Sequence, residues 1–173
     1  MKIEHRVSLV GQITDNLCWL AAFQMLEGWY NHRLPKRPTA FTPTQLAHLK
    51  TLNWGVQPHA VGGFATLMGL TIKIAPPTLA GVGDLLKTYG PLWYPGKNTG
   101  YLPVGTHHVV VLRGLAGTDL SINDPSPVGK GSLRTLPATT FFQQLQPLGN
   151  QFLVMLAGSV PNTAAILNDL KVR

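Results

Sequence analysis

The chain has 173 residues, of which 45% are hydrophobic and only 12% are charged, a composition typical of a single domain with a substantial core. The net charge is +7, but the basic residues are scattered, so we expect no nucleic-acid partner. No apolar run reaches the roughly 18 residues of a membrane span. The first residues, MKIEHR, lack the apolar segment of a signal peptide.

Helices are expected in the first part of the chain. An extended lead-in over 1–11 precedes the segment 17–30, whose apolar residues cover nearly every face of a helix. Such a helix is buried on all sides, which suits a central position. Thr42, followed by proline, predicts the beginning of a second helix. A third helix is expected over 58–68.

Strands dominate the second part, where the hydrophobic period changes to two. The expected elements are a strand over 70–74, a helix over 79–89, a strand over 91–94, a loop over 96–106, a hairpin of strands over 107–114 and 120–123, a helix over 137–146, a strand over 152–157 and a short helix after 161. This order predicts one α+β domain over 1–173, with a helical lobe over about 12–69 and a mostly antiparallel sheet lobe over about 70–158.

Cys18 is the only cysteine, so the chain forms no internal disulfide. It follows Thr14, Asp15 and Asn16, three residue types that cap helices, and it precedes an alanine-rich apolar run. This position in the first turn of a helix favours a thiolate, because the helix N-terminus stabilises negative charge. The alternative is that Cys18 is a small buried hydrophobic residue.

A base and a carboxylate are expected to meet in the hairpin. His107 begins the first strand and Asp124 ends the strand that pairs with it, so the two ends lie side by side. A catalytic cysteine needs such a base, and the base needs an orienting acceptor. Because successive side chains on a strand point to opposite faces, His108 and Asn123 are alternatives to these two residues.

Three ordered motifs resemble those of papain-like cysteine peptidases, namely Gln12 before Cys18-Trp19, His107 before a Val-Val pair, and Asn123-Asp124-Pro125. The likeness extends to bacteriocin-processing peptidases, which cut after paired glycines, and to effector proteases of plant pathogens. It implies a papain-like fold, with the nucleophile helix packed on the sheet. It also implies Cys18 as the nucleophile, His107 as the base and Asp124 as its orienting group. Gln12 would donate to the oxyanion.

The motif places the base first, which favours His107 over His108. Asn123 stays the alternative to Asp124, because it follows His107 by sixteen residues, the spacing found in papain. Trp19 and Trp93 are candidate substrate-binding residues, with the core as the alternative position for both. The long loop over 96–106 is a candidate substrate gate.

The expected function is therefore hydrolysis of peptide bonds in a protein or peptide substrate, without cofactor or metal. The resemblance implies a bacterial effector or interbacterial toxin, exported by a dedicated secretion system and met by a cognate immunity protein. The likeness to bacteriocin-processing peptidases implies cleavage directed to Gly-Gly. A cytoplasmic enzyme is the alternative location. Other functions left open are acyl transfer of the transglutaminase type and an inactive binding module. Residues 140–173 carry no motif that transfers.

Overall fold

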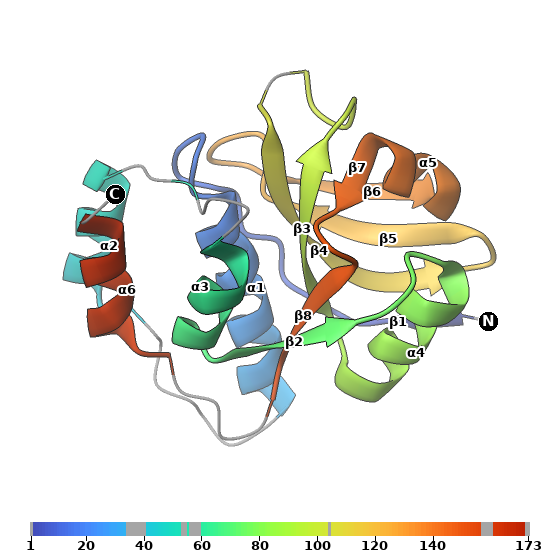
Figure 1. Cartoon of the computed structure of the whole chain (residues 1–173), viewed down its shortest axis with the longest axis horizontal. Helices are drawn as coiled ribbons and strands as arrows, with labels where there is room; N and C mark the ends of the chain where they lie inside the picture. Colours follow the sequence, from blue (N-terminus) through green and yellow to red (C-terminus); the bar gives the residue numbers. More distant parts are fainter. Residues whose placement is uncertain are drawn as a thin grey trace.

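The structure is a computed structural model that describes residues 2–33, 41–52, 55, 60–103, 105–156 and 161–171. It confirms the α+β class and the order of helices before strands (Figure 1). The elements are β1 (Lys2–Glu4), α1 (Cys18–Arg33), α2 (Pro43–Leu52), α3 (Val61–Leu67), β2 (Leu70–Ile74), α4 (Leu79–Tyr89), β3 (Leu92–Asn98), β4 (His107–Ala116), β5 (Asp119–Asp124), β6 (Ser132–Pro137), α5 (Ala138–Gln144), β7 (Leu145–Pro147), β8 (Gln151–Met155) and α6 (Thr163–Lys171). The expected beginning of the third helix, at 58, lies outside the described residues.

The strands form one sheet in the order β2-β8-β3-β4-β5-β6, with β1 added to β4 and β7 added to β3. Each of these pairings is antiparallel. The sequence analysis did not predict β6, whose burial alternates weakly between intermediate and exposed. This strand completes the sheet beyond β5 and so borders the hairpin that was expected to carry the site.

Two hydrophobic cores occupy the two faces of the sheet. Val109 and Val111 of β4 pack into the core that contains α1, whereas Val110 and Leu112 belong to the core under α4 and α5. This division follows from the alternation of side chains along a strand. Figure 1 shows α1, α2, α3 and α6 gathered on one side of the molecule and α4 and α5 on the other.

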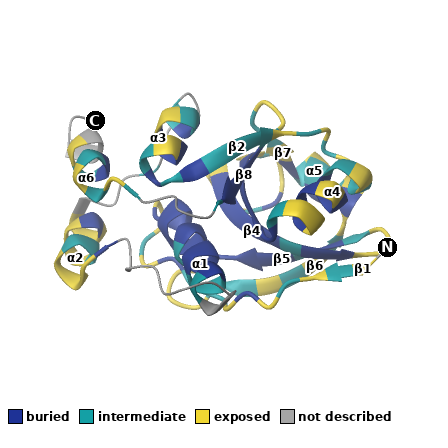
Figure 2. Cartoon of the chain, turned by 90° about the horizontal axis from the view of Figure 1, so that it is seen from below, coloured by how far each residue is buried: buried dark blue, intermediate teal, exposed yellow. Residues whose placement is uncertain are grey.

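Helix α1 is the most deeply buried helix described, as Figure 2 shows by its colour. Residues 17–23 are all buried, and Trp19, Ala22 and Phe23 have no exposed surface. The sequence predicted this burial, because a helix with apolar residues on all faces must be covered on all faces. None of the helices in the described ranges is both long and apolar enough to cross a membrane.

Local capping signals fix two of the other helices. Thr42 and Gln45 form a capping box at α2, in which the Thr42 hydroxyl accepts from the Gln45 N–H and the Gln45 side chain accepts from the Thr42 N–H. Thr78 accepts from the Gly81 N–H at the beginning of α4, and Gly90 ends that helix with a positive φ of 88°. Both helices therefore begin where the sequence predicted.

A β-bulge interrupts the pairing of β4 with β5. Next to the turn, Ala116 pairs with Asp119, but after the extra residue Arg113 the register has moved by one, and Leu112 pairs with Ile122. The Arg113 carbonyl accepts a hydrogen bond at 2.8 Å from the backbone N–H of His5, in the lead-in. The lead-in strand β1 thus crosses beside β4 where the bulge occurs.

We expect Gly114→Ala to lower the free energy of unfolding by about 2 kcal/mol, because overpacking against backbone atoms forces a shift. A Cβ at Gly114 would lie 2.4 Å from the Ile3 carbonyl oxygen and 3.1 Å from Glu4 Cα. The matched variant is Gly28→Ala in α1, where a Cβ meets nothing within 4 Å. It should raise stability by about 0.5 to 1 kcal/mol. Urea denaturation measures both, and equal effects would contradict this reading of the β1–β4 contact.

Candidate active site

The thiol of Cys18 lies at the first residue of α1, as the sequence predicted. A turn precedes it, in which the Leu17 N–H donates to the Thr14 carbonyl at 3.3 Å. Cys18 keeps 9% of its surface exposed, whereas its neighbours Leu17 and Trp19 are almost completely covered. The buried helix therefore fixes the thiol in place and presents a small part of it to the outside.

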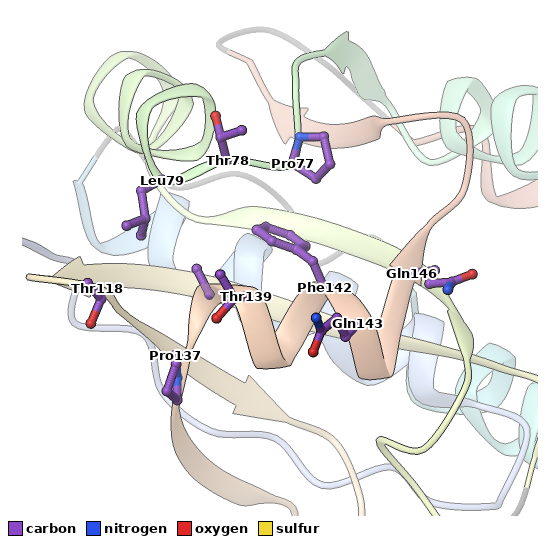
Figure 3. A pocket seen from close by; sticks show the side chains of 10 residues that line it. Pro77, Thr78, Leu79, Thr118, Pro137, Thr139, Phe142, Gln143 and Gln146 are labelled. Atoms are coloured by element: carbon purple, nitrogen blue, oxygen red, sulfur yellow. The ribbon is translucent and has the colours of Figure 1, made fainter.

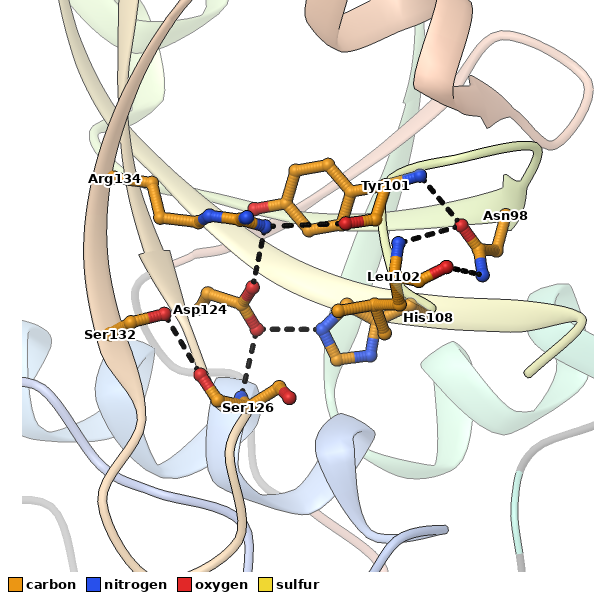
Figure 4. A network of polar contacts seen from close by, with 8 residues as sticks. All are labelled: Asn98, Tyr101, Leu102, His108, Asp124, Ser126, Ser132 and Arg134. Carbon is orange, nitrogen blue, oxygen red and sulfur yellow. Dashed lines mark hydrogen bonds and ion pairs between the residues drawn. The ribbon is translucent and has the colours of Figure 1, made fainter. Parts of the chain in front are cut away.

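The imidazole beside this thiol belongs to His108. Its Nε2 lies 2.7 Å from Asp124 Oδ1, and the two side chains are 3% and 1% exposed. The same carboxylate oxygen accepts from the Ser126 N–H at 2.8 Å. A hydrogen bond and the charge of Cys18 also act on His108. The structure thus brings Cys18, His108 and Asp124 together (Figure 4 shows the His108–Asp124 contact).

The prediction that His107 faces the thiol is corrected by this geometry. His107 is exposed, and its Nδ1 lies 3.0 Å from the hydroxyl of the preceding Thr106. It points away from Asp124 because residues 107 and 108 lie on opposite faces of β4. Asn123, the alternative to Asp124, is buried and donates to the Val7 carbonyl at 3.0 Å. Its side chain holds the lead-in and does not orient the imidazole.

The bulge in β4 explains the error. Near the turn, Ala116 pairs with Asp119. If this register continued without the bulge, Asp124 would lie opposite Val111, whose side chain is on the same face of β4 as that of His107. The extra residue moves the pairing by one, so that Asp124 comes opposite Val110, on the face that His108 shares. Gly114, next to the extra residue, is the one local signal, because an isolated glycine in a strand indicates a bulge or a close backbone approach.

The pKa values of the two histidines are shifted in opposite directions. Burial by itself lowers the pKa of His108, but hydrogen bonds and charges of Asp124 and Cys18 outweigh it and raise that pKa to about 9. For His107, partial burial and the nearby positive charge of Lys97 lower the pKa from its ordinary 6.5. At neutral pH the buried imidazole therefore carries a proton and the exposed one is mostly neutral.

Gln12 is anchored on the same side of the molecule as Asp124. Its N–H donates to the Pro125 carbonyl at 2.9 Å, and its carbonyl accepts from the Gly129 N–H at 2.8 Å. The side chain is 5% exposed, and its Nε2 makes a long contact of 3.4 Å with the Asp15 carbonyl. The backbone is thus tightly held, whereas the amide donor is only weakly engaged.

Trp19 and Trp93 are core residues, which corrects their assignment to substrate binding. Both have no exposed surface, so neither can contact a substrate in this structure. The Trp93 indole donates to the Trp19 carbonyl at 3.0 Å, and the Trp19 ring packs edge-on against Phe64 at 4.8 Å. Their function is to fasten the first turn of α1 to the sheet and to α3.

Two residues that the sequence analysis did not single out lie next to the His108–Asp124 pair. Arg134 of β6 places its guanidinium 3.4 Å from Asp124 Oδ2. Tyr101, in the loop after β3, lies with its ring centroid 6.1 Å from that of His108. The only available signal was the place of Tyr101 in the expected loop over 96–106, because β6 was not predicted.

A separate pocket of about 670 Å³ lies between α4 and α5, on the other side of the sheet from α1 (Figure 3). Its lining is mostly apolar, with Leu79 and Phe142 facing it together with uncharged Thr and Gln side chains. None of the site residues described above lines it. Among the described residues, no group of three His, Cys, Asp or Glu could hold a metal ion.

A thiol at the beginning of a buried helix, set against an imidazole–carboxylate pair on a sheet, defines the class of papain-like thiol hydrolases. Comparison with known families agrees. Residues 2–145 match the family model described as papain-like cysteine protease AvrRpt2, and the chain belongs to this family. It is accordingly a papain-like cysteine peptidase. No curated protein matches the chain significantly.

Two solved structures show the same fold at low sequence identity, and a third is similar at a lower TM-score. A protein named as a C39-like peptidase from Bacillus anthracis is 13% identical, with a TM-score of 0.60 over 92% of this chain and 99% of that one. The peptidase domain of Streptococcus ComA, a bifunctional ABC transporter involved in a quorum-sensing pathway, is 17% identical, with a TM-score of 0.56 over 87% and 100%. A double glycine motif protease from an AMS/PCAT transporter, in complex with its leader peptide, is 20% identical over 87% and 91%, with a TM-score of 0.48.

We expect the two histidines to titrate on opposite sides of pH 6.5, His107 below it and His108 near pH 9. Because the folded pKa of His108 is raised, its contribution to stability is full below about pH 6.5 and is lost as the pH rises through about 9. NMR titration of the imidazole protons measures both values. Cys18→Ala should lower the pKa of His108 and leave that of His107 unchanged. Equal pKa values for the two rings would contradict the site geometry.

Proposed function

We propose that the chain hydrolyses peptide bonds through Cys18, His108 and Asp124, with Gln12 as an oxyanion donor. The observation that carries this proposal is the buried His108–Asp124 pair beside the thiol, in which the pKa of His108 is raised to about 9. A protonated imidazole at neutral pH stabilises a thiolate by charge and by hydrogen bonding. The site is thereby prepared for nucleophilic attack before a substrate binds.

The proposed reaction has two stages. The Cys18 thiolate attacks the peptide carbonyl carbon, a C–S bond forms, and the carbonyl electron pair moves to oxygen. The His108 imidazolium then protonates the leaving amine as the C–N bond breaks, which leaves a thioester. Water attacks this thioester, gives a proton to His108, and releases the carboxylic acid with the thiolate restored. Asp124 keeps Nε2 of His108 occupied, so that the other ring nitrogen serves the reaction.

Gln12 is suited to hold the negative oxygen of each tetrahedral intermediate. Its backbone is fixed by hydrogen bonds to Pro125 and Gly129, which lie in the segment that follows Asp124. Within the described residues, the Nε2 donor makes only the long contact to the Asp15 carbonyl, so it can turn to a developing oxyanion at little cost. The Cys18 N–H is the expected second donor, because the first N–H groups of a helix have no partner within the helix.

Two further proposals concern the substrate. The sequence resemblance to effector proteases supports action on proteins of another cell, which would imply a cognate inhibitor in the producing cell. The resemblance to bacteriocin-processing peptidases supports cleavage after paired glycines. The residues that precede the cleaved bonds distinguish these two proposals.

We expect wild-type protein, incubated with cell lysate, to generate new N-termini that Cys18→Ala does not generate. His108→Ala should lose activity by about a thousand-fold or more, and the neighbouring His107→Ala should keep most of it. Mass spectrometry of labelled N-termini measures all four proteins and reads the residues before each cut. Circular dichroism controls for folding. Activity that survives in folded Cys18→Ala would remove the nucleophile assignment, and products joined to added amines would indicate acyl transfer.

Gln12→Ala should lower kcat by roughly a hundred-fold with little change in KM, because an oxyanion donor acts in the transition state. Steady-state kinetics on a peptide taken from the lysate experiment separates the two constants. Gln12→Glu is the matched variant, since it keeps the size of the side chain but removes the donor. An effect on KM alone would assign Gln12 to substrate binding.

A further inference from the structure

The carboxylate of Asp124 is occupied on both oxygens. Oδ1 accepts from His108 at 2.7 Å and from the Ser126 N–H at 2.8 Å. Oδ2 faces the guanidinium of Arg134 at 3.4 Å, and this contact comes from β6, the strand on the far side of β5. Asp124 is 1% exposed, while the Arg134 side chain is 37% exposed and reaches in from the surface. The buried carboxylate therefore has a cation on the side away from the imidazole.

Arg134 also covers the ring of Tyr101. Its Cζ lies 4.4 Å from the Tyr101 ring centroid, and its Nη1 lies 3.5 Å from the Tyr101 carbonyl oxygen. The same ring lies near His108, with the two planes inclined by 31°. Tyr101 is 4% exposed, so it shields the imidazole from water. Figure 4 shows the guanidinium and the phenol ring next to each other above Asp124, with the imidazole beside its carboxylate.

The side chain of Asn98 makes five hydrogen bonds to the backbone of the loop that carries Tyr101. The Asn98 amide oxygen accepts from the backbone N–H groups of Gly100, Tyr101 and Leu102, at 3.3, 2.9 and 3.0 Å. Its Nδ2 donates to the carbonyls of Leu102 and Gly105, at 3.1 and 2.9 Å. This loop begins at the end of β3 and is tied to itself, so Tyr101 has a fixed backbone. The sequence had suggested a substrate gate here, whereas the described part of the loop is bound over the site.

The charges at the site require such a cation. In the reactive state, Cys18 and Asp124 are negative and His108 is positive, which leaves one uncompensated negative charge in a largely buried cluster. Arg134 supplies the missing positive charge and stays protonated at any working pH. Within the described ranges, the titratable groups that face the His108–Asp124 pair are Cys18 of α1, Tyr101 and Arg134.

We propose that Arg134 is a positioning residue of the peptidase site, which holds Asp124 and Tyr101 against His108 and neutralises the cluster of charges. The proposal rests on the proposed function, because it assumes that Cys18 reacts as a thiolate paired with His108. It assigns to Arg134 two separable contributions. The charge favours the ionised form of the cluster, and the planar guanidinium packs on the phenol ring.

The test is the pH dependence of Cys18 alkylation by iodoacetamide, which needs no substrate. In wild-type protein the thiol should react well below the pH at which a free thiol does. Arg134→Met should move the acid limb of this profile upward by about one pH unit, because a partly exposed charge at this distance is screened. Arg134→Lys should restore at least half of the shift. Arg113→Met, which breaks an ion pair with Glu4 elsewhere on β4, should have no effect.

The outcomes distinguish this proposal from the proposed function. An ordinary thiol profile in wild-type protein would remove the thiolate–imidazolium pair and with it the peptidase mechanism. A fast wild-type thiol whose acid limb is unchanged in Arg134→Met would overturn the role of Arg134 alone. If Arg134→Met does not fold, Arg134→Lys decides. An acid limb within about half a pH unit of the wild-type one supports the role of the charge, and a kcat/KM lowered several-fold supports the packing of the guanidinium on Tyr101. An acid limb in Arg134→Lys that moves by a full unit contradicts the role of the charge.

Discussion

The hydrogen bond between His108 and Asp124 is the constraint on which the site depends. Both groups are almost completely buried, and such a pair is stable only when each partner is present and well placed. The two residues come from adjacent strands, so their distance is set by the pairing of β4 with β5. The thiol comes from a different part of the fold. Its approach to His108 therefore depends on how α1 is held against the sheet.

Helix α1 achieves this through burial. It is covered by the sheet on one side, and its Trp19 ring packs against Phe64 of α3. The Trp93 indole fastens its first turn through the Trp19 carbonyl. Large aromatic side chains without exposed surface pack at the density of a crystal, so the helix has little freedom to shift. Trp19 and Trp93, which the sequence suggested as substrate contacts, thus hold the first turn of the helix that carries Cys18.

The lead-in before α1 is bound to β5 and to the segment that follows Asp124. Asn123 donates to the Val7 carbonyl, and Gln12 exchanges backbone hydrogen bonds with the segment after Asp124. Gly11 has to be a glycine, because a Cβ there would lie 2.6 Å from the Lys130 nitrogen. Asn123, the sequence-based alternative to Asp124, instead holds the segment that leads to Gln12, the proposed oxyanion donor.

The sequence by itself determined the α+β class, the buried helix, the thiol at its beginning and the hairpin with its carboxylate, because these follow from local periodicity and from residues that cap or end elements. Only the tertiary structure decided between His107 and His108. The turn alone would have put His107 on the face of Asp124, and the bulge at Arg113 moved the register by one residue. Tyr101 and Arg134 were likewise beyond reach, because the loop after β3 and the strand β6 come beside His108 and Asp124 only when the sheet is assembled. Local patterns specify what a segment becomes, whereas a bulge and a contact between segments arise only when the strands pair.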